Sequence, residues 1–320
     1  MSRTRSDFKT IKVRGKAYAN GGYNEGICLV QSRSSGTKYI DKRVGYKAMK
    51  GGYAQREVKA MLQWRDHPNI VCIAGHNLKD SARLGYGSIF MQHCELGDVE
   101  GVIEHYMRRK QRLADEGFLW KVFWDVSLAL ASLWTGRGAT HIWDRAIAGK
   151  TTTEKGDREY TRILHRDLKP ANFFLTAQSL DGQPMHYPRV VLGDLGASVT
   201  LDDVRSGRVN SNKQSYWTPQ FTAPEFPKYY TRTDMYQLAL TIQCVARLSN
   251  VPDMQRFPPW DPLPSAFMDE GLRKLLEECL QENYQNRPLP GDLPMMVLKG
   301  YKKWTSKYGN GEKSASWTFR

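Results

Sequence analysis

The eight residues from His165 to Asn172, with the sequence His-Arg-Asp-Leu-Lys-Pro-Ala-Asn, constrain this chain more than any other feature. They place a carboxylate, an ammonium group and an amide on one short loop, at Asp167, Lys169 and Asn172. Asp167 could orient an attacking hydroxyl and accept its proton, while Lys169 could neutralise charge on a phosphoryl group. Asn172 could ligate a metal held by a nucleotide. The spacing therefore indicates a loop that handles phosphate rather than an ordinary polar surface turn.

A second carboxylate, Asp194, lies in the sequence Gly-Asp-Leu-Gly-Ala after an apolar Val-Val-Leu run, and Ala-Pro-Glu follows at 223–225. In this order, the three motifs resemble the catalytic loop, the Asp-Phe-Gly motif and the end of the activation segment of eukaryotic serine/threonine protein kinases. The resemblance covers about residues 8 to 295. The stretch Met-x-His-Cys-Glu-x-Gly-Asp at 91–98 is similar to that of the NIMA-related group as it occurs in fungi.

The resemblance implies an α+β, bilobal protein kinase-like fold, with a small β-rich N-lobe and a larger, mainly helical C-lobe. It places the kinase domain at residues 1–300 and a basic C-terminal tail at 301–320. The expected parts of the domain are the N-lobe at about 8–94, the hinge at about 91–98, the C-lobe at about 98–300 and an exposed insertion at about 136–162.

Hydrophobic patterning agrees with a β-rich first third and a helix-rich remainder. Alternating or apolar runs bounded by turn residues predict strands at 26–31, 37–44, 70–79 and 87–93. Apolar residues at helical spacing predict an amphipathic helix at 118–134 and further helices at 54–64, 233–248 and 269–282. The segment 136–162 is rich in Gly, Thr and charged residues and shows no period, so we expect it to be exposed.

The resemblance assigns Lys42, in the second predicted strand, and Glu57, in the first predicted helix, to an ion pair that holds the nucleotide's α- and β-phosphates. Lys38 is the alternative, because the connection from Lys42 to Glu57 is a few residues shorter than usual in the family. Residue 40 is Ile, where the family usually has a small Ala packed on the adenine.

Four further residues are expected to bind the nucleotide. Gly22 and Gly26 belong to a glycine-rich run that departs from the family pattern by lacking the central Gly, and an ordinary hairpin turn remains the alternative. Gln92 and Cys94 would supply the hinge carbonyl and amide that bind adenine. The implied cofactors are ATP and Mg²⁺, with Asn172 and Asp194 as the metal ligands and Asp167 and Lys169 as the catalytic residues.

Residues near the end of the activation segment have expected roles as well. Thr218 would contact Asp167 and Lys169, as in kinases that act on serine or threonine. Glu225 should pair with Arg287, and Asp234 should cap the backbone of the catalytic loop. These last three residues are structural in the family.

Other residues at or near the activation segment bear on regulation of the kinase and on the shape of its substrate groove. Arg166 could pair with a phosphate on the activation segment, for which Ser211 and Ser215 are candidate acceptors. Trp217 replaces the family's usual Gly, which would change the shape of the substrate groove.

The sequence therefore predicts an ATP-dependent protein kinase that acts on serine or threonine. Two other classes remain open. A pseudokinase scaffold would explain the altered glycine-rich run, Ile40 and Trp217, although every ionic residue that the reaction needs is present. A small-molecule phosphotransferase of the aminoglycoside or choline kinase type shares a similar loop, but the intact Ala-Pro-Glu and the following Asp234 favour a protein substrate.

Composition narrows the class of partner and the compartment. The formal net charge is +14, which favours encounters with polyanions, yet no dense basic block is interleaved with aromatic residues. We therefore expect acidic protein partners rather than dedicated nucleic-acid binding. No apolar run is long enough for a membrane span or a signal peptide. We therefore expect an intracellular protein, in the cytoplasm or the nucleus, that does not associate with membranes. The five scattered cysteines indicate reduced core thiols.

Overall fold

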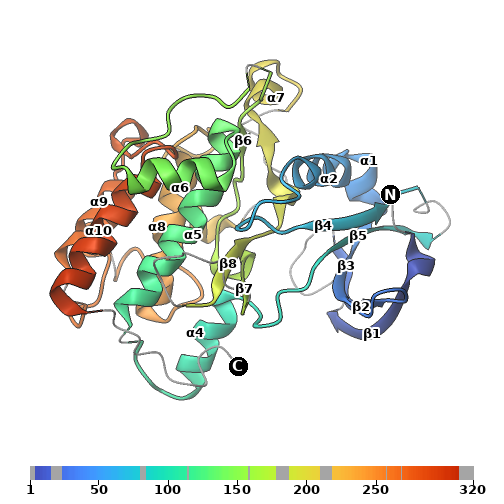
Figure 1. The fold of residues 1–320 in the computed structure, drawn as a ribbon, viewed down its shortest axis with the longest axis horizontal. Helices are drawn as coiled ribbons and strands as arrows, with labels where there is room; N and C mark the ends of the chain where they lie inside the picture. The colour runs from blue at the N-terminus through green and yellow to red at the C-terminus, as the bar shows by residue number, and fades with distance from the viewer. Residues whose placement is uncertain are drawn as a thin grey trace. The chain divides into compact units, whose positions relative to one another are not determined.

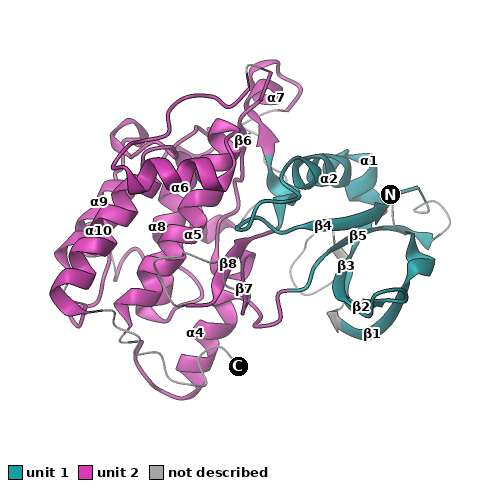
Figure 2. Cartoon of the chain, viewed as in Figure 1, with its two compact units in different colours: residues 1–93, 194–198 teal, residues 94–193, 199–320 magenta. Residues whose placement is uncertain are grey.

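The computed structural model describes residues 4–15, 24–79, 84–113, 115–157, 159–177, 187–209, 218–256, 258–267 and 269–309. The chain divides into two compact units, shown in different colours in Figure 2. Unit 1 comprises residues 1–93 together with 194–198, and unit 2 comprises residues 94–193 and 199–320. A β-rich first unit and a mainly helical second unit confirm the bilobal protein kinase fold that the motifs implied.

Unit 1 is built on a five-stranded antiparallel sheet, labelled in Figure 1. Its strands are β1 (Phe8–Gly15), β2 (Asn24–Ser32), β3 (Lys38–Gly45), β4 (Ile73–Asn77) and β5 (Tyr86–Gln92). They lie in the order β1-β2-β3-β5-β4, so β3 is the central strand and pairs with β2 and β5. The four strands expected from the sequence are confirmed, and β1 is an additional one.

One face of this sheet is covered by the segment that precedes and begins β1. The ring of Phe8 stacks on that of Phe90 with 4.2 Å between centroids, and it packs with Cys28 and Val30 in one buried cluster. Side chains alternate between the two faces of a strand. Asp41 of β3 lies opposite Cys28, so the next residue, Lys42, points to the face opposite this cluster. The described helices of unit 1 include η1 (Arg5–Asp7), α1 (Tyr46–Lys50) and α2 (Tyr53–Gln63).

Unit 2 is mainly helical. Its longer helices are α4 (Val99–Arg108), α5 (Glu116–Thr135), α6 (Ala139–Ile147), α8 (Thr233–Arg247), α9 (Glu270–Cys279) and α10 (Leu293–Tyr308). Its short strands are β6 (Ile163–Leu164), β7 (Phe173–Thr176), β8 (Arg189–Leu192) and β9 (Val199–Thr200), which pair as β6–β9 and β7–β8. Short helical turns complete the unit: η2 (Pro170–Asn172), α7 (Leu201–Arg205), η4 (Pro219–Phe221) and η5 (Tyr284–Asn286).

The helix α5 differs from its expected form. It covers the predicted range, but every residue from Gly117 to Thr135 is buried, so the helix is not amphipathic. A helix that is apolar all round belongs in the interior of a large domain, and α5 contacts α8, α10 and β8. The buried Lys121 and Asp125 form an ion pair within this helix, with 3.0 Å between Nζ and Oδ1. Asp125 Oδ2 also accepts a hydrogen bond from the backbone amide of Val190 at 2.7 Å, which ties β8 to α5.

Two segments contain helices that the sequence did not predict. The segment 136–162, expected to be an exposed insertion, has many exposed residues but also contains α6, whose Ile142 is buried. The amide of Thr152 in the same segment bonds to the carbonyl of Gly291 at 2.8 Å. Residues 301–308 are not a tail but the second half of α10, with Tyr301 and Trp304 buried. Periodicity missed α6 because a helix of nine residues leaves few apolar positions to count.

The ion pair expected between Glu225 and Arg287 is confirmed. Arg287 Nη1 and Nη2 each lie 2.8 Å from a carboxylate oxygen of Glu225, in a bidentate arrangement. Burial alone would raise the pKa of Glu225, but hydrogen bonds from Arg287 and Thr233 outweigh burial and lower it. The pair holds the Glu of Ala-Pro-Glu to the residue that follows η5.

All five cysteines are free thiols, as expected, and four of them are buried while Cys72 is half-buried. Within the ranges given above, no helix is at once long enough and apolar enough to cross a bilayer.

Replacing Arg287 with Ala should destabilise the protein by about 3–5 kcal/mol, because it leaves the carboxylate of Glu225 buried without its cation. The matched control is Arg208→Ala, which removes an exposed guanidinium paired with Asp203 at 2.9 Å. An exposed pair contributes at most about 1 kcal/mol. Urea denaturation of both variants measures the difference. Equal losses of stability would show that the buried pair has no special structural role.

Candidate active site

In unit 1, two carboxylates converge on Lys42. Lys42 Nζ lies 2.6 Å from Glu57 Oε1 and 2.6 Å from Asp194 Oδ1. Lys42 lies in the central strand β3, opposite Ile27 of β2 and Ile89 of β5, and is only 5% exposed. Glu57 lies on the buried face of α2. The ion pair expected between β3 and the first helix is therefore formed, and Lys42 forms it.

Lys38, the alternative, is exposed at the first residue of β3 and makes no ion pair with a described residue. Burial alone would lower the pKa of Lys42, but the carboxylates of Asp194 and Glu57 outweigh burial and hold that pKa above its ordinary value. Lys42 is therefore a permanently charged group inside the protein. A buried ammonium that keeps its charge suits an anionic ligand such as a nucleotide phosphate.

Asp194 has an unusual backbone conformation. Its φ of 55° lies in the left-handed region, which non-glycine residues seldom adopt and which costs of order 1–3 kcal/mol. From there the side chain caps the 3₁₀ turn η3 (Leu195–Ala197). A Cβ on the following Gly196 would lie 3.1 Å from Asp194 Oδ1 and 3.4 Å from Glu57 Oε2. The glycine of Asp-Leu-Gly thus leaves room for the two carboxylates.

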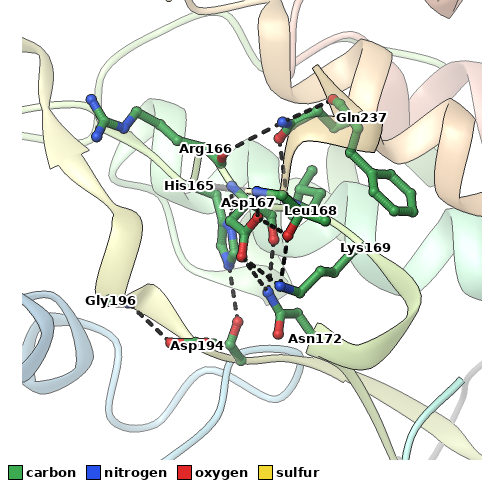
Figure 3. Close-up of polar contacts among 12 residues, drawn as sticks. His165, Arg166, Asp167, Leu168, Lys169, Asn172, Asp194, Gly196 and Gln237 are labelled. Atoms are coloured by element: carbon green, nitrogen blue, oxygen red, sulfur yellow. Dashed lines mark hydrogen bonds and ion pairs between the residues drawn. The ribbon is translucent and has the colours of Figure 1, made fainter. Parts of the chain in front are cut away.

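In unit 2, Asp167 is held by four groups, of which those of Lys169 and Asn172 can be followed in Figure 3. Its Oδ1 accepts hydrogen bonds from the hydroxyl of Thr218 at 2.8 Å and from the Thr218 amide at 3.0 Å. Its Oδ2 lies 2.9 Å from Lys169 Nζ, which also donates to the Thr218 hydroxyl at 2.8 Å. The side-chain amide of Asn172 donates to the backbone carbonyl of Asp167 at 2.7 Å. The contacts expected of Thr218 are confirmed.

The backbone of the same loop rests on α8. Asp234 Oδ2 and Oδ1 accept hydrogen bonds from the amides of His165 and Arg166, both at 2.9 Å, which confirms the predicted cap. Arg166 has a φ of 72°, a second strained position beside Asp167. The His165 ring contacts the carbonyl of Gly193, the residue before Asp194, with 3.0 Å between Nε2 and the oxygen.

Two supporting residues were missed from the sequence. Gln237 Oε1 accepts the amide of Leu168 at 3.2 Å, and the hydroxyl of Tyr229 donates to the same oxygen at 2.7 Å. Gln237 is buried and lies three residues after Asp234 on α8, so helical spacing from the predicted cap was the signal that could have found it. Nothing comparable marks Tyr229 in the sequence.

The residues expected to bind the nucleotide lie in different parts of the structure. Gln92 is the last residue of β5, and its amide bonds to the carbonyl of Cys72 at 2.8 Å. Cys94 begins the part of the chain that belongs to unit 2, and burial, with a further contribution from Glu95, raises the pKa of its thiol to about 12. Gly26 lies at an irregularity between β2 and β3 with a φ of 146°, a value that glycine tolerates best. Gly22 lies outside the described residues.

Other expectations concern residues 210–217, which also lie outside the described ranges: the phosphate acceptors Ser211 and Ser215, and Trp217. Arg166 itself is buried, and its guanidinium lies over the ring of Tyr229, 5.8 Å from the centroid.

The residues assigned to Mg²⁺ are oxygen donors, as this hard cation prefers. Asp194 offers a carboxylate, and Asn172 has its amide nitrogen engaged with Asp167, which leaves the amide oxygen for a ligand. In the described part of the chain, no cluster of three or more His, Cys, Asp or Glu side chains forms a self-sufficient metal site.

The chain is similar in sequence to known protein kinases. The chain is 28% identical over 82% of its length to the G2-specific protein kinase nimA of Emericella nidulans, covering 37% of that protein. It is 29% identical over 69% of its length to the human serine/threonine-protein kinase Nek2, covering 43% of it. It is 25% identical over 95% of its length to the mouse interferon-induced, double-stranded RNA-activated protein kinase, covering 52% of it.

The chain thus spans between about a third and half of the length of these relatives. No protein-family model matches it. In its fold, the order of its motifs and these sequence relatives, the chain is similar to eukaryotic serine/threonine protein kinases, among them NIMA and Nek kinases.

Proposed function

We propose that this chain is a catalytically active protein kinase, which transfers the γ-phosphate of Mg-ATP to a serine or threonine hydroxyl of a protein. The observation that carries the proposal is the state of Asp167, whose carboxylate is buried and held by Thr218 and Lys169. A carboxylate so restrained can receive a hydroxyl in one orientation. The relatives are named as protein kinases, and human Nek2 is named as a serine/threonine-protein kinase, which supports the same activity.

Asp167 would accept the proton of the acceptor hydroxyl as the oxygen attacks phosphorus. Its Oδ1 already receives a hydroxyl, that of Thr218, at 2.8 Å. Lys169 Nζ, 2.9 Å from Oδ2, orients the carboxylate of Asp167 and would place a positive charge where a phosphoryl group gains negative charge. The backbone bonds from Asp234 and Gln237 hold these groups in place, because the loop cannot shift without breaking them.

The nucleotide phosphates would be held by Lys42, which Glu57 keeps in position at 2.6 Å. Mg²⁺, when bound, would shield the phosphate charges, with Asp194 and Asn172 as its protein ligands. Lys42 now contacts Asp194 at 2.6 Å, so nucleotide binding would exchange part of this ion pair for contacts to phosphate. Gly22, Gly26, Gln92 and Cys94 remain our candidates for the backbone contacts to ATP.

The choice of acceptor follows from Thr218 and Lys169. Lys169 and Thr218 contact each other at 2.8 Å, and together they would form a shallow site beside Asp167 that suits a serine or threonine side chain better than a phenol. Protein substrates inside the cell, and acidic partners attracted by the net charge of +14, belong to the same proposal.

The alternative is a pseudokinase that kept the fold as a binding scaffold. Ile40 in β3 and the altered glycine-rich run favour it, since both would affect adenine and phosphate binding. The first experiment below separates the two functions, because a scaffold has no transfer activity to lose.

Asp167→Asn should lower kcat for phosphate transfer by at least about 100-fold, because the amide cannot accept the proton of the hydroxyl. The apparent KM for ATP should change little, since Asp167 handles the acceptor. The control is Asp144→Asn, the same exchange at an exposed position of α6. Transfer from radiolabelled ATP to a generic protein substrate, with thermal unfolding as the test of folding, gives both values. A wild-type chain without activity would establish the scaffold instead.

Lys42→Met should reduce transfer by orders of magnitude, because the phosphates lose the cation that Glu57 positions. Lys38→Met removes the same charge from an exposed position of the same strand and should retain most of the activity. The comparison uses single-turnover transfer together with nucleotide binding. Loss of activity in Lys38→Met alone would transfer the role to Lys38.

Phosphoamino-acid analysis of a labelled protein substrate should yield phosphoserine and phosphothreonine. The shallow space beside Thr218 and Lys169 is the reason for this expectation. Predominant phosphotyrosine would contradict it, as would label confined to a small molecule such as an aminoglycoside.

A further inference from the structure

The solvent-exposed side of α10 is rich in lysine. Lys299, Lys302, Lys303 and Lys307, which we call the lysine face, are all exposed, and Ser306 lies among them. Residues three, four and eight positions apart in a helix fall on one side of it. The four ammonium groups therefore form one stripe along the second half of α10, extending over about 12 Å of helix axis.

The opposite side of α10 holds the helix in place. Val297, Tyr301 and Trp304 are buried, and α10 packs along α5 (Figure 1). The indole nitrogen of Trp304 donates a hydrogen bond to Glu116 Oε2 at 2.7 Å, which ties α10 to the first residue of α5. The backbone that carries the lysine face is therefore already ordered, and a ligand would not have to fold it.

No acid within α10 balances the charge of the lysine face. The sequence of α10 contains no acidic residue, and Lys299, Lys302 and Lys303 make no ion pair with any described residue. The charge of Lys307 is partly balanced by two acids of α9, Glu270 and the capping residue Asp269. Like charges gathered on one helix face repel one another, so an anionic ligand would relieve a cost that the free protein bears.

We propose that the lysine face of α10 is a docking surface for an acidic segment of a partner protein. An extended segment spans about 12 Å with about four residues, so a short acidic run matches the stripe in length and in charge. Each contact would be exposed and weak, so the face would recruit partners through several pairs acting together.

Two other polyanions fit the face less well. A membrane-binding helix needs apolar side chains that can enter the lipid, but those of α10 are spent on α5, and the ring of the exposed Tyr308 lies under Lys307, 4.8 Å from its Nζ. Nucleic-acid surfaces add side chains that stack on bases or hydrogen-bond to their edges. The α10 sequence has no Arg, Asn or Gln, and its Trp304 is buried.

The test is binding of a fluorescein-labelled peptide of alternating Glu and Ser to the full chain, followed by anisotropy at 0.15 M salt. One variant replaces the four lysines of the lysine face with Gln. The matched control replaces Lys9, Lys12, Lys47 and Lys50 with Gln, which are exposed lysines of unit 1, so that both variants lose the same charge. A short DNA duplex and vesicles of phosphatidylserine and phosphatidylcholine replace the peptide in parallel titrations.

The lysine-face variant should bind the peptide about tenfold or more weakly, since an exposed ion pair contributes a factor of about 1.4 to 5 and several act together. The control should stay within about twofold of the natural chain. Equal weakening in both variants would overturn the proposal, because net charge alone would then explain binding. Tighter binding to the duplex or the vesicles than to the peptide would overturn it as well, as would no binding of the peptide.

The binding test does not depend on phosphate transfer, because none of the four lysines is among the proposed catalytic residues. A chain that binds the peptide through α10 but transfers no phosphate would keep this inference and refute the proposed function. In an active chain, the lysine-face variant should raise KM for an acidic protein substrate and leave kcat unchanged.

Discussion

The carboxylate of Asp234 lies beneath the catalytic loop and accepts hydrogen bonds from two consecutive backbone amides, those of His165 and Arg166. Backbone amides buried without a partner are costly, so this carboxylate is what allows the loop to run through the interior. It also stabilises the strained backbone of Arg166, whose φ is 72°. Asp167 follows immediately, and its side chain can be held by Thr218 and Lys169 only because the preceding backbone does not move.

A second support comes from the buried helix α5. Its Lys121–Asp125 pair is fully buried, and Asp125 also receives the amide of Val190 in β8. Taking two charges out of water is expensive, and the cost is offset only when good geometry and further hydrogen bonds accompany the pair. Since β8 leads through Gly193 to Asp194, this pair determines where the strand ends and the metal-binding candidate begins.

Buried charges are also paired in unit 1, where Lys42 contacts both Glu57 and Asp194. Two carboxylates and one ammonium leave a net negative charge, which suits a site that would receive Mg²⁺ with the nucleotide. The charge of α10 is arranged in the opposite way, with four exposed lysines and no acid in the helix. Charge inside the protein thus serves the proposed chemistry, and charge on its surface serves the proposed recruitment of partners.

Short motifs with well-defined chemical roles were enough to predict the fold class, the order of the motifs and the pair Glu225–Arg287. They left Lys38 as an alternative to Lys42, and the structure showed that Lys42 is the partner of Glu57. The tertiary structure alone decided that α5 is buried on every side, that 136–162 contains a helix and that residues 301–308 continue α10. It also revealed Gln237 and Tyr229 as supports of the catalytic loop. Hydrophobic periodicity identifies a helix and its apolar side. The residues that bury the helix or form hydrogen bonds with it lie scores of positions away along the chain, so only the folded chain shows which they are.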